Sequence, residues 1–267
     1  MTFSLTGKTA LVTGGSKGIG AAAARSLSEA RARVAICSRD AAELVQTATE
    51  IENKTGHRVL PIQADVTSAA DVERLMREVQ DSLGGVDILV NNAGSAGEIG
   101  PFEELPTELY TSLYELNVVS MVRLVKAVLP AMKAKKWGRI INISSENGLQ
   151  PDPDMTPYNL TKAAIINLSK SLSKSLGAYN ILVNTVSPAF IYTPLVADML
   201  AGIAARTGRT PEQALQDFLE HKRPHIELKR AGRTEEVGSV IAFLASEQAS
   251  FITGTNLRVD GGSVAAI

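Results

Sequence analysis

The stretch KTALVTGGSKGIG, residues 8–20, decides the fold of this chain. Its first half is a short apolar run, 8–12, that predicts a buried strand. The glycines at 14, 18 and 20 keep the following turn tight, bring the backbone near a ligand and let an alanine-rich helix, 21–30, pack on the strand. The start of that helix offers N–H groups and a positive dipole end to a phosphate. A glycine-rich turn without a ligand is the alternative, because the spacing G-x-x-x-G-x-G differs from the G-x-G-x-x-G fingerprint.

Strands and helices alternate along the rest of the chain. Apolar runs predict strands at 8–12, 33–37, 58–63, 86–90, 138–144, 180–186 and 255–259. Helical stretches fill most of the gaps, at 41–54, 69–83, 107–134, 156–177 and 234–246. This order predicts an α/β fold, with a Rossmann-type doubly wound sheet of about seven parallel strands, in a single domain over residues 1–267. Ligands of such sheets bind beyond the carboxyl ends of the strands, where Asn91, Ser145 and Pro188 are expected.

The composition indicates a globular protein. Apolar residues make up 45% of the 267 residues and charged residues 21%, which suffices for a sizeable core. The net charge of −1 gives no reason to expect a nucleic-acid or anionic-membrane surface. We find no cleavable signal and no apolar run near the ~20 residues of a membrane helix, so a cytoplasmic protein is expected. The lone Cys37 falls in a predicted strand and is interpreted as a buried, small apolar residue.

A second motif is Tyr158-Asn159-Leu160-Thr161-Lys162, with Ser145 thirteen residues before the tyrosine. A phenol has an ordinary pKa of about 10, and a nearby cation lowers that pKa by stabilising the phenolate. Positions i and i+4 share one face of a helix, so Lys162 can lie near the Tyr158 hydroxyl and tune it as a proton donor and acceptor. By itself Tyr-x-x-x-Lys is common on helix surfaces, and it becomes informative only beside the glycine turn.

With both motifs in place, the chain closely resembles the short-chain dehydrogenase/reductase family, and within it the 3-oxoacyl thioester and carbonyl reductases. The resemblance runs from about Leu5 to Gly262. The family's elements follow in order: the turn 13–20, Asp65-Val66 after the third strand, Asn91-Asn92-Ala93-Gly94 after the fourth, and Pro188–Thr193, the segment that closes over nicotinamide. Two positions depart from the family pattern. Ala189 and Arg31 stand where the family often has glycine, which adopts more backbone conformations. The backbone of the loop after Pro188 and the turn that ends the first helix are therefore expected to differ from those of the family.

The resemblance implies the residues of a site. Its catalytic set would be Asn117, Ser145, Tyr158 and Lys162. Tyr158 would exchange the proton, Ser145 would hold the substrate oxygen, and Lys162 would lower the tyrosine pKa and bind the nicotinamide ribose. Asn117 would anchor a water that links Lys162 to solvent. Cofactor contacts would come from Gly14, Ser16, Lys17, Gly18, Ile19, Gly20, Ser38, Arg39, Asp65, Val66, Asn92, Ala93, Gly94, Tyr158, Lys162, Pro188, Ile191 and Thr193.

Structural alternatives exist for some of these residues. Ser144 and Ser145 could both cap a strand end, and the spacing to the tyrosine selects Ser145. Asn117 could simply satisfy backbone groups in a kinked helix. No metal site is expected, because Pro224 interrupts the helix between His221 and His225 and no carboxylate partner is evident.

The end of the second strand, Ser38-Arg39-Asp40, bears on the choice of cofactor. An acidic group there accepts hydrogen bonds from the ribose 2′-hydroxyl of NAD, whereas an arginine suits the 2′-phosphate of NADP. Arg39 stands at this position and Lys17 adds a second cation, so NADP(H) is favoured over NAD(H). Two alternatives remain: Asp40 could turn inward and bind ribose, and Arg39 could be a solvated loop charge.

Substrate specificity is expected in three stretches, Ser95 to Pro101, Glu146 to Thr156, and a lid at about 190–230. The first half of the lid is apolar, which suits a hydrophobic carbonyl compound. Its later part carries charges of both signs, Arg223 among them, and is interpreted as a solvated face. A basic run, Lys133 to Lys136 with Arg139, is a candidate contact for an acidic acyl carrier protein.

The leading hypothesis is an NADP-dependent short-chain dehydrogenase/reductase (EC 1.1.1 type) that reduces an apolar ketone or 3-oxoacyl thioester. The alternatives are an NAD(P)-dependent alcohol or sugar dehydrogenase and a non-catalytic NADP-binding redox sensor. The expected partner is a small-molecule substrate, with no nucleic acid and no membrane. The resemblance also implies a homotetramer (or homodimer) formed through helices 107–134 and 156–177 and the C-terminal strand, with the apolar tail 263–267 against a neighbour.

Overall fold

Within residues 3–265, which this computed structural model describes, the chain folds around a seven-stranded parallel sheet. The strand order is β3-β2-β1-β4-β5-β6-β9, and each neighbouring pair runs parallel. The predicted doubly wound sheet is therefore confirmed. Its strands are β1 (Thr9–Thr13), β2 (Arg33–Ser38), β3 (Val59–Gln63), β4 (Ile88–Asn91), β5 (Gly138–Ile143), β6 (Ile181–Pro188) and β9 (Asn256–Val259).

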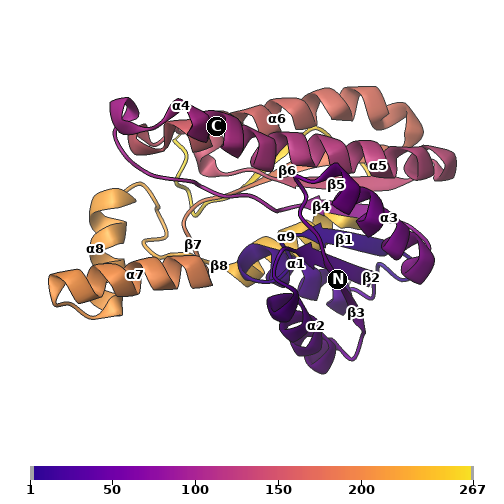
Figure 1. The fold of residues 1–267 in the computed structure, drawn as a ribbon, viewed down its shortest axis with the longest axis horizontal. Helices are drawn as coiled ribbons and strands as arrows, with labels where there is room; N and C mark the ends of the chain where they lie inside the picture. Colours follow the sequence, from indigo (N-terminus) through magenta and orange to yellow (C-terminus); the bar gives the residue numbers. More distant parts are fainter. Residues whose placement is uncertain (1–2, 266–267) are drawn as a thin grey trace.

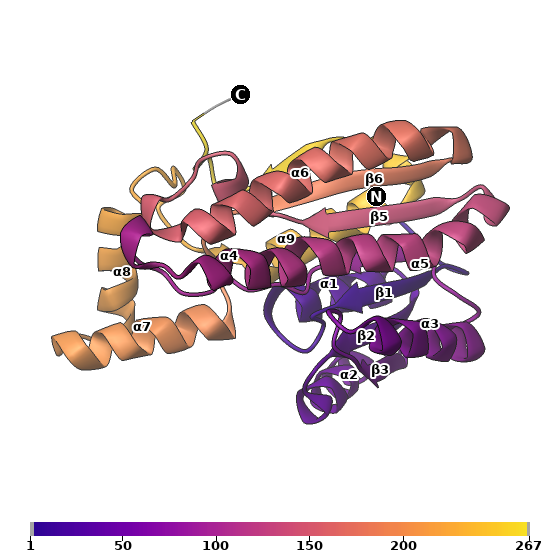
Figure 2. The ribbon, with the colours of Figure 1, turned by 45° about the horizontal axis from the view of Figure 1, so that its top comes forward.

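Helices cover both faces of the sheet (Figures 1 and 2). One face packs against α1 (Gly18–Glu29), α2 (Ala41–Thr55) and α9 (Thr234–Ala245). The other packs against α3 (Ala69–Leu83), α5 (Ser120–Lys135) and α6 (Thr156–Leu176). Successive strand residues point to opposite faces, so a strand buried on both sides must be apolar throughout. β1 meets this condition, because Ala10 and Val12 join one core and Leu11 the other.

The helical stretch expected over 107–134 is confirmed, but it is not regular α-helix throughout. It consists of α4 (Thr107–Tyr114), a π-helical turn (Glu115–Val119) and α5. The turn widens the backbone around Asn117, whose side chain is buried and hydrogen-bonded to a neighbouring loop. Single π turns inside α-helices are frequent at functional sites, and their local geometry leaves no signal in the periodicity of apolar residues.

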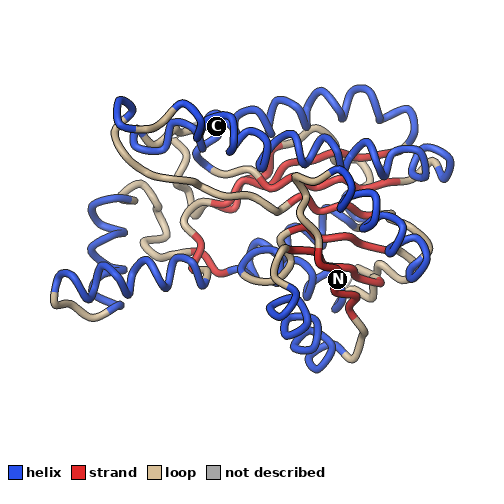
Figure 3. The backbone as a smooth tube through the Cα atoms, viewed as in Figure 1, coloured by secondary structure: helices blue, strands red, loops and turns tan. Residues whose placement is uncertain are grey.

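The region 190–230 forms an arm that projects from the body (Figure 1, orange). It contains α7 (Pro194–Thr207) and α8 (Pro211–Lys222), which share a small apolar core of Leu200, Ala204 and Ala214. Its base is held by a short parallel pair that the sequence did not reveal, β7 (Ile191–Tyr192) with β8 (Gly232–Arg233). Figure 3 shows loops between the carboxyl ends of the strands and this arm. The arm therefore stands next to the edge of the sheet where the predicted site residues lie.

The surroundings of several single residues can be compared with what the sequence predicts. Cys37 is fully buried, as predicted, and Arg31 adopts the left-handed conformation (φ 70°) that its glycine-like position requires. Arg139 cannot take part in the expected acyl carrier contact of the basic run, because it is 1% exposed and lies 4.3 Å from the centre of the Trp137 ring. Lys135 is engaged in an ion pair with Asp87 at 2.8 Å. The contact of the lysines stays a prediction. None of the helices in residues 3–265 is long and apolar enough to cross a membrane.

Gly20 provides a test of how tightly α1 packs on the glycine turn. A Cβ at this position would lie 2.1 Å from the carbonyl oxygen of Gly14 and 2.6 Å from Asn92 Nδ2. Because the first of these atoms is backbone, Gly20→Ala should lower the free energy of unfolding by about 1–3 kcal/mol or more, as measured by urea denaturation. Gly177→Ala is the control, since a Cβ there meets nothing within 4 Å and the backbone is helical (φ −56°). Equal stability of the two variants would contradict this packing.

Candidate functional site

Two neighbouring cavities open at the carboxyl edge of the sheet. The first, of about 420 Å³, lies over the ends of β1, β2 and β4. The second, of about 390 Å³, lies over the ends of β5 and β6. Ile19, Asn92, Gly94, Ser95 and Thr193 are among the residues that line both. The two cavities therefore form one continuous candidate site.

Most of the predicted cofactor contacts line these cavities. The first is lined by Gly14, Ser16, Lys17, Gly18, Ile19, Ser38, Arg39, Asp65, Val66, Asn92, Ala93, Gly94 and Thr193. The second adds Tyr158, Lys162, Pro188 and Ile191. Gly20 lines neither cavity, because it is committed to the contact of α1 with the turn. Ala189 has no left-handed backbone angle, so this departure from the family pattern leaves the loop unstrained.

Thr13, which the sequence did not single out, joins the two loops that form the first cavity. Its Oγ1 accepts hydrogen bonds from the backbone N–H groups of Asn92 and Ala93, each at 3.0 Å. In return, Asn92 Nδ2 donates to the carbonyl oxygens of Thr13 and Gly14 at 3.0 and 3.1 Å. The turn after β1 and the turn after β4 are therefore held as a unit. The threonine lies inside the family motif, and its contacts depend on the pairing of β1 with β4.

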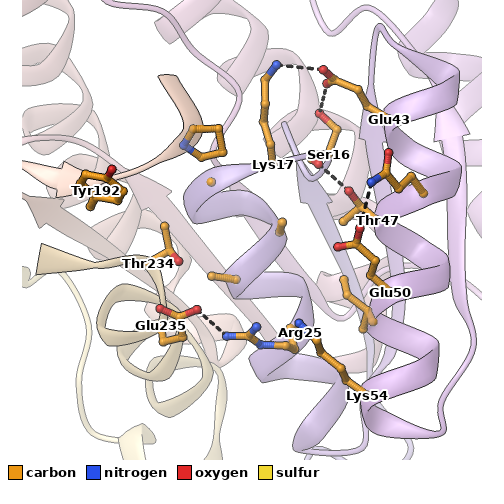
Figure 4. A pocket seen from close by; sticks show the side chains of 16 residues that line it. Ser16, Lys17, Arg25, Glu43, Thr47, Glu50, Lys54, Tyr192, Thr234 and Glu235 are labelled. Atoms are coloured by element: carbon orange, nitrogen blue, oxygen red, sulfur yellow. Dashed lines mark hydrogen bonds and ion pairs between the residues drawn. The ribbon is translucent and has the colours of Figure 1, made fainter. Parts of the chain in front are cut away.

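The cation in the glycine turn has a carboxylate partner. Lys17 Nζ lies 3.0 Å from Glu43 Oε1, and Ser16 Oγ donates to Glu43 Oε2 at 3.2 Å. Figure 4 shows both side chains turned toward Glu43, above a groove of about 410 Å³ between α1 and α2. Within residues 3–265 the guanidinium of Arg39, by contrast, makes no hydrogen bond or ion pair. Arg39 is therefore the more available of the two cations.

Asp40 does not turn toward the cavity. Its carboxylate caps α2, with Oδ1 accepting a hydrogen bond from the backbone N–H of Glu43 at 3.0 Å. An N-cap carboxylate stabilises a helix by satisfying one of its free N–H groups. Asp40 also does not line the first cavity, so the structure gives no support to the alternative in which Asp40 binds a ribose.

Three residues of the predicted catalytic set meet in the second cavity. Ser145 follows β5, and Tyr158 and Lys162 lie on the first turns of α6. Ser145 and Lys162 are buried, and Tyr158 is half-buried. Lys162 Nζ donates to the carbonyl oxygen of Ile143 at 2.9 Å and lies 5.3 Å from the centre of the Tyr158 ring. The Ser145 hydroxyl, the Tyr158 phenol and the Lys162 amine therefore line the same cavity.

Asn117 lies behind this cavity and lines neither of the two. Its Oδ1 accepts from the backbone N–H of Ser95 at 2.9 Å, and its Nδ2 donates to the Ser95 carbonyl and to Thr161 Oγ1 at 2.9 and 3.0 Å. The side chain thereby ties the loop after β4 to α6. These contacts agree with the structural alternative for Asn117, and its link to a water stays a prediction.

Comparisons with known proteins agree with this arrangement. A family model described as enoyl-(acyl carrier protein) reductase matches residues 14–264. The oxidoreductase YvrD of Bacillus subtilis is 36% identical over 100% of both chains. A D-beta-hydroxybutyrate dehydrogenase of Rhizobium meliloti is 34% identical, over 96% of this chain and 98% of the relative.

The chain belongs to the short-chain dehydrogenase/reductase family. The family's proteins are oxidoreductases, so this protein is an enzyme of that class. Among solved structures, the L-sorbose reductase of Gluconobacter frateurii superposes with a TM-score of 0.94, at 33% identity and over 100% of both chains. That reductase was crystallised with NADPH and L-sorbose.

The electrostatics of the site in this family member differ from expectation at Tyr158. Burial raises the pKa of Tyr158; a hydrogen bond from Ser145 and the charge of Arg223 oppose the rise, and Glu146 adds to it. Burial also lowers the pKa of Lys162 to about 8. The expected lowering of the tyrosine pKa by Lys162 is therefore absent. The ammonium of Lys162 is directed at the Ile143 carbonyl, and desolvation of the phenol outweighs the remaining attractions.

Two of the stretches expected to set substrate specificity bring charged residues together beside Ser145, and the sequence did not predict their pairing. Glu146 is buried, and Arg223 reaches it from the end of α8 while pairing with Asp152 at 2.7 Å. The interpretation of Arg223 as part of a solvated face is wrong, because its side chain is only 15% exposed. Spacing along the sequence cannot signal the contact, since it depends on how the arm folds back.

No cluster of three or more His, Cys, Asp or Glu side chains within residues 3–265 could hold a metal ion. His221 instead places its Nδ1 2.9 Å from the carbonyl oxygen of Asp217, one turn earlier in α8. His221 and His225 both line a third cavity beside the arm.

The buried amine of Lys162 has a measurable consequence for stability. Its folded pKa of about 8 lies below the ordinary 10.5, so the folded state binds fewer protons than the unfolded state between these values. Stability then rises with pH in that window. Relative to Lys162→Met, the wild type should gain up to about 1.4 kcal/mol per pH unit between pH 8 and 10.5. Urea denaturation at pH 7, 8, 9 and 10 measures the difference.

Lys174→Met removes an exposed lysine from the same helix and serves as the control for losing a lysine as such. Parallel stability profiles of the wild type and Lys162→Met between pH 8 and 10 would contradict the perturbed amine.

Proposed function

We propose that this enzyme reduces a ketone to a secondary alcohol with NADP(H). The observation that carries the proposal is the convergence of Ser145, Tyr158 and Lys162 in a cavity that continues into the cavity of the glycine turn. One cavity suits a carbonyl compound and the other a dinucleotide. Further support comes from the L-sorbose reductase, similar along its whole length and crystallised with NADPH.

Each catalytic candidate has a distinct part in this reaction. Ser145 donates a hydrogen bond to the carbonyl oxygen and stabilises the negative charge that develops there. Tyr158 gives its phenolic proton to that oxygen, and its raised pKa keeps it protonated near neutrality. Lys162, with a pKa near 8, is a donor that can also exchange a proton close to working pH. Bound nicotinamide supplies the hydride.

The residues of the first cavity fit a dinucleotide. The turn residues Gly14 and Gly18 have positive φ angles, 62° and 57°, which bring the backbone close to the cavity at the start of α1. That helix start offers N–H groups to a pyrophosphate. Two cations are available to a 2′-phosphate, Lys17 and Arg39, and the guanidinium of Arg39 has no partner within residues 3–265. These features support NADP(H) over NAD(H).

The walls of the second cavity differ in character. Phe190, Ile191, Leu195 and Val196 form an apolar side, which supports the expected apolar ketone or 3-oxoacyl thioester. Glu146 and Arg223 form a polar side. This polar side favours the second candidate, an alcohol or sugar dehydrogenase, and the comparison with L-sorbose reductase points the same way.

The remaining expectations are parts of the same proposal. The arm 190–230 serves as a substrate lid, and the enzyme works in the cytoplasm as a homotetramer or homodimer. Of the tail proposed to contact a neighbour, Ala266 and Ile267 lie outside the described residues. The backbone N–H of Ala265 donates a hydrogen bond to Gln150 Oε1 at 3.2 Å. This described residue of the tail therefore contacts its own chain. Sizing chromatography that gives a monomer would contradict the oligomer.

Tyr158→Phe tests the proton donor. The substitution removes only the hydroxyl, so NADPH oxidation with any accepted ketone should fall by about 10²-fold or more, while the Kd for NADPH stays within a factor of two or so of the wild type. Steady-state kinetics and a fluorescence titration measure the two effects. Tyr179→Phe, on an exposed tyrosine far from the site, is the matched control. Retained turnover in Tyr158→Phe would refute the mechanism.

Glu43→Gln tests the contribution of Lys17 to cofactor choice. The substitution removes the carboxylate that pairs with Lys17 and would repel a 2′-phosphate, so NADPH should bind about two- to fivefold more tightly, with little change for NADH. Calorimetric titration gives both affinities without turnover. Glu50→Gln is the control, because this glutamate lies on the same helix and its carboxylate accepts a hydrogen bond from Gln46. An equal gain for NADH would contradict a phosphate contact of Lys17.

The direct test of the function is oxidation of NADPH and of NADH against a panel of ketones, including a 3-oxoacyl thioester and a hydrophobic diketone. Turnover with NADPH and far less with NADH is the expected result. Binding of NADPH without turnover of any ketone would favour a redox sensor.

A further inference from the structure

Charged side chains form one wall of the cavity beside Ser145. Glu146 is 4% exposed, and its Oε2 accepts a hydrogen bond from Ser263 Oγ. Arg223 reaches this wall from the arm, with Nε 3.8 Å from Glu146 Oε1 and Nη1 2.7 Å from Asp152 Oδ2. The side chain of Asp152 is 22% exposed. Glu146, Asp152 and Arg223 are called the charged wall below.

The charged wall lies where two cavities meet. Glu146 and Arg223 line the cavity that holds Ser145 and Tyr158. The same two residues, together with Asp152, line the next cavity, of about 380 Å³, beneath the arm. A molecule whose carbonyl group faces Tyr158 therefore has room to continue along the charged wall toward Asp152.

The chemistry of the wall discriminates between substituents on such a molecule. A substrate carboxylate would compete with Asp152 for Arg223 and would face the carboxyl group of Glu146. An alkyl chain would cover three polar groups without replacing their hydrogen bonds to water, which is costly. A hydroxyl group both donates and accepts, so one hydroxyl can donate to a carboxylate oxygen and accept from the guanidinium.

We infer that the charged wall binds the hydroxyl groups of a neutral, polyhydroxylated ketone and selects this substrate class over keto acids and unsubstituted ketones. The inference rests on the proposed carbonyl reduction at Tyr158. The apolar side of the cavity, which includes Phe190 and Leu195, accepts the carbon–hydrogen face of the same molecule. Both sides of the cavity are then used by one ligand.

Three ketones of six carbons test this selection: L-sorbose, 2-hexanone and 5-oxohexanoate, each with NADPH. The wild type should reduce L-sorbose with a kcat/KM at least about tenfold above the other two, because a site built for hydroxyl groups rejects analogues that lack them. The double variant Glu146→Gln, Asp152→Asn leaves Arg223 as an unpaired cation. Its kcat/KM for 5-oxohexanoate relative to L-sorbose should rise at least about tenfold, mainly through KM.

Glu227→Gln is the matched control. The side chain of this glutamate is 71% exposed, and it does not line either of the two cavities beside the charged wall. Its substrate ratios should equal those of the wild type. If the wild type reduces 2-hexanone as efficiently as L-sorbose and the double variant leaves the ratios unchanged, the subsite is overturned while carbonyl reduction stands. If no ketone of these or of the wider panel is reduced, the proposed function falls and the subsite with it.

Discussion

The close contact between α1 and the turn after β1 is the constraint on which the site depends. At this contact the carbonyl oxygen of Gly14 occupies the space that a side chain at position 20 would need. Asn92 fills the remaining space and bonds to the same backbone. The contact places the amino end of α1 over the sheet edge, and it brings the loop after β4 alongside. Both walls of the first cavity are thus positioned at this one contact.

From that contact a chain of polar side chains extends to the second cavity. Thr13 holds the loop after β4, Asn117 ties the same loop to α6, and α6 carries Tyr158 and Lys162. Thr13 and Asn117 are themselves buried, and hydrogen bonds of buried polar groups are costly to leave unmade. The positions of the candidate donor and of the glycine turn are therefore coupled, although they lie far apart in the sequence.

The sequence predicted those parts of the molecule that depend on local pattern. Apolar periodicity located the seven strands within one or two residues at most ends, and the turn 13–20 with Tyr158 and Lys162 indicated the family. Features set by the tertiary arrangement were missed. Glu43 and Lys17 are 26 residues apart and Arg223 and Asp152 are 71 apart, so their pairing depends on how α2 and the arm lie. The pKa of Tyr158 was also misjudged, because the extent of its burial is decided by packing.

The π turn at Glu115–Val119 has a consequence for the phase of the helices around it. Each residue of an α-helix advances the helix by about 100°, and the wider turn lets α4 and α5 present faces that a continuous α-helix would not align. If residues 115–119 were wound as regular α-helix instead, one of the two helices would be rotated by about that angle. Either Asn117 would leave Ser95, or the residues of α5 that pack on the sheet, Leu124 and Val128 among them, would face solvent. The π turn thus allows Asn117 to reach Ser95 while the apolar residues of α5 stay packed on the sheet.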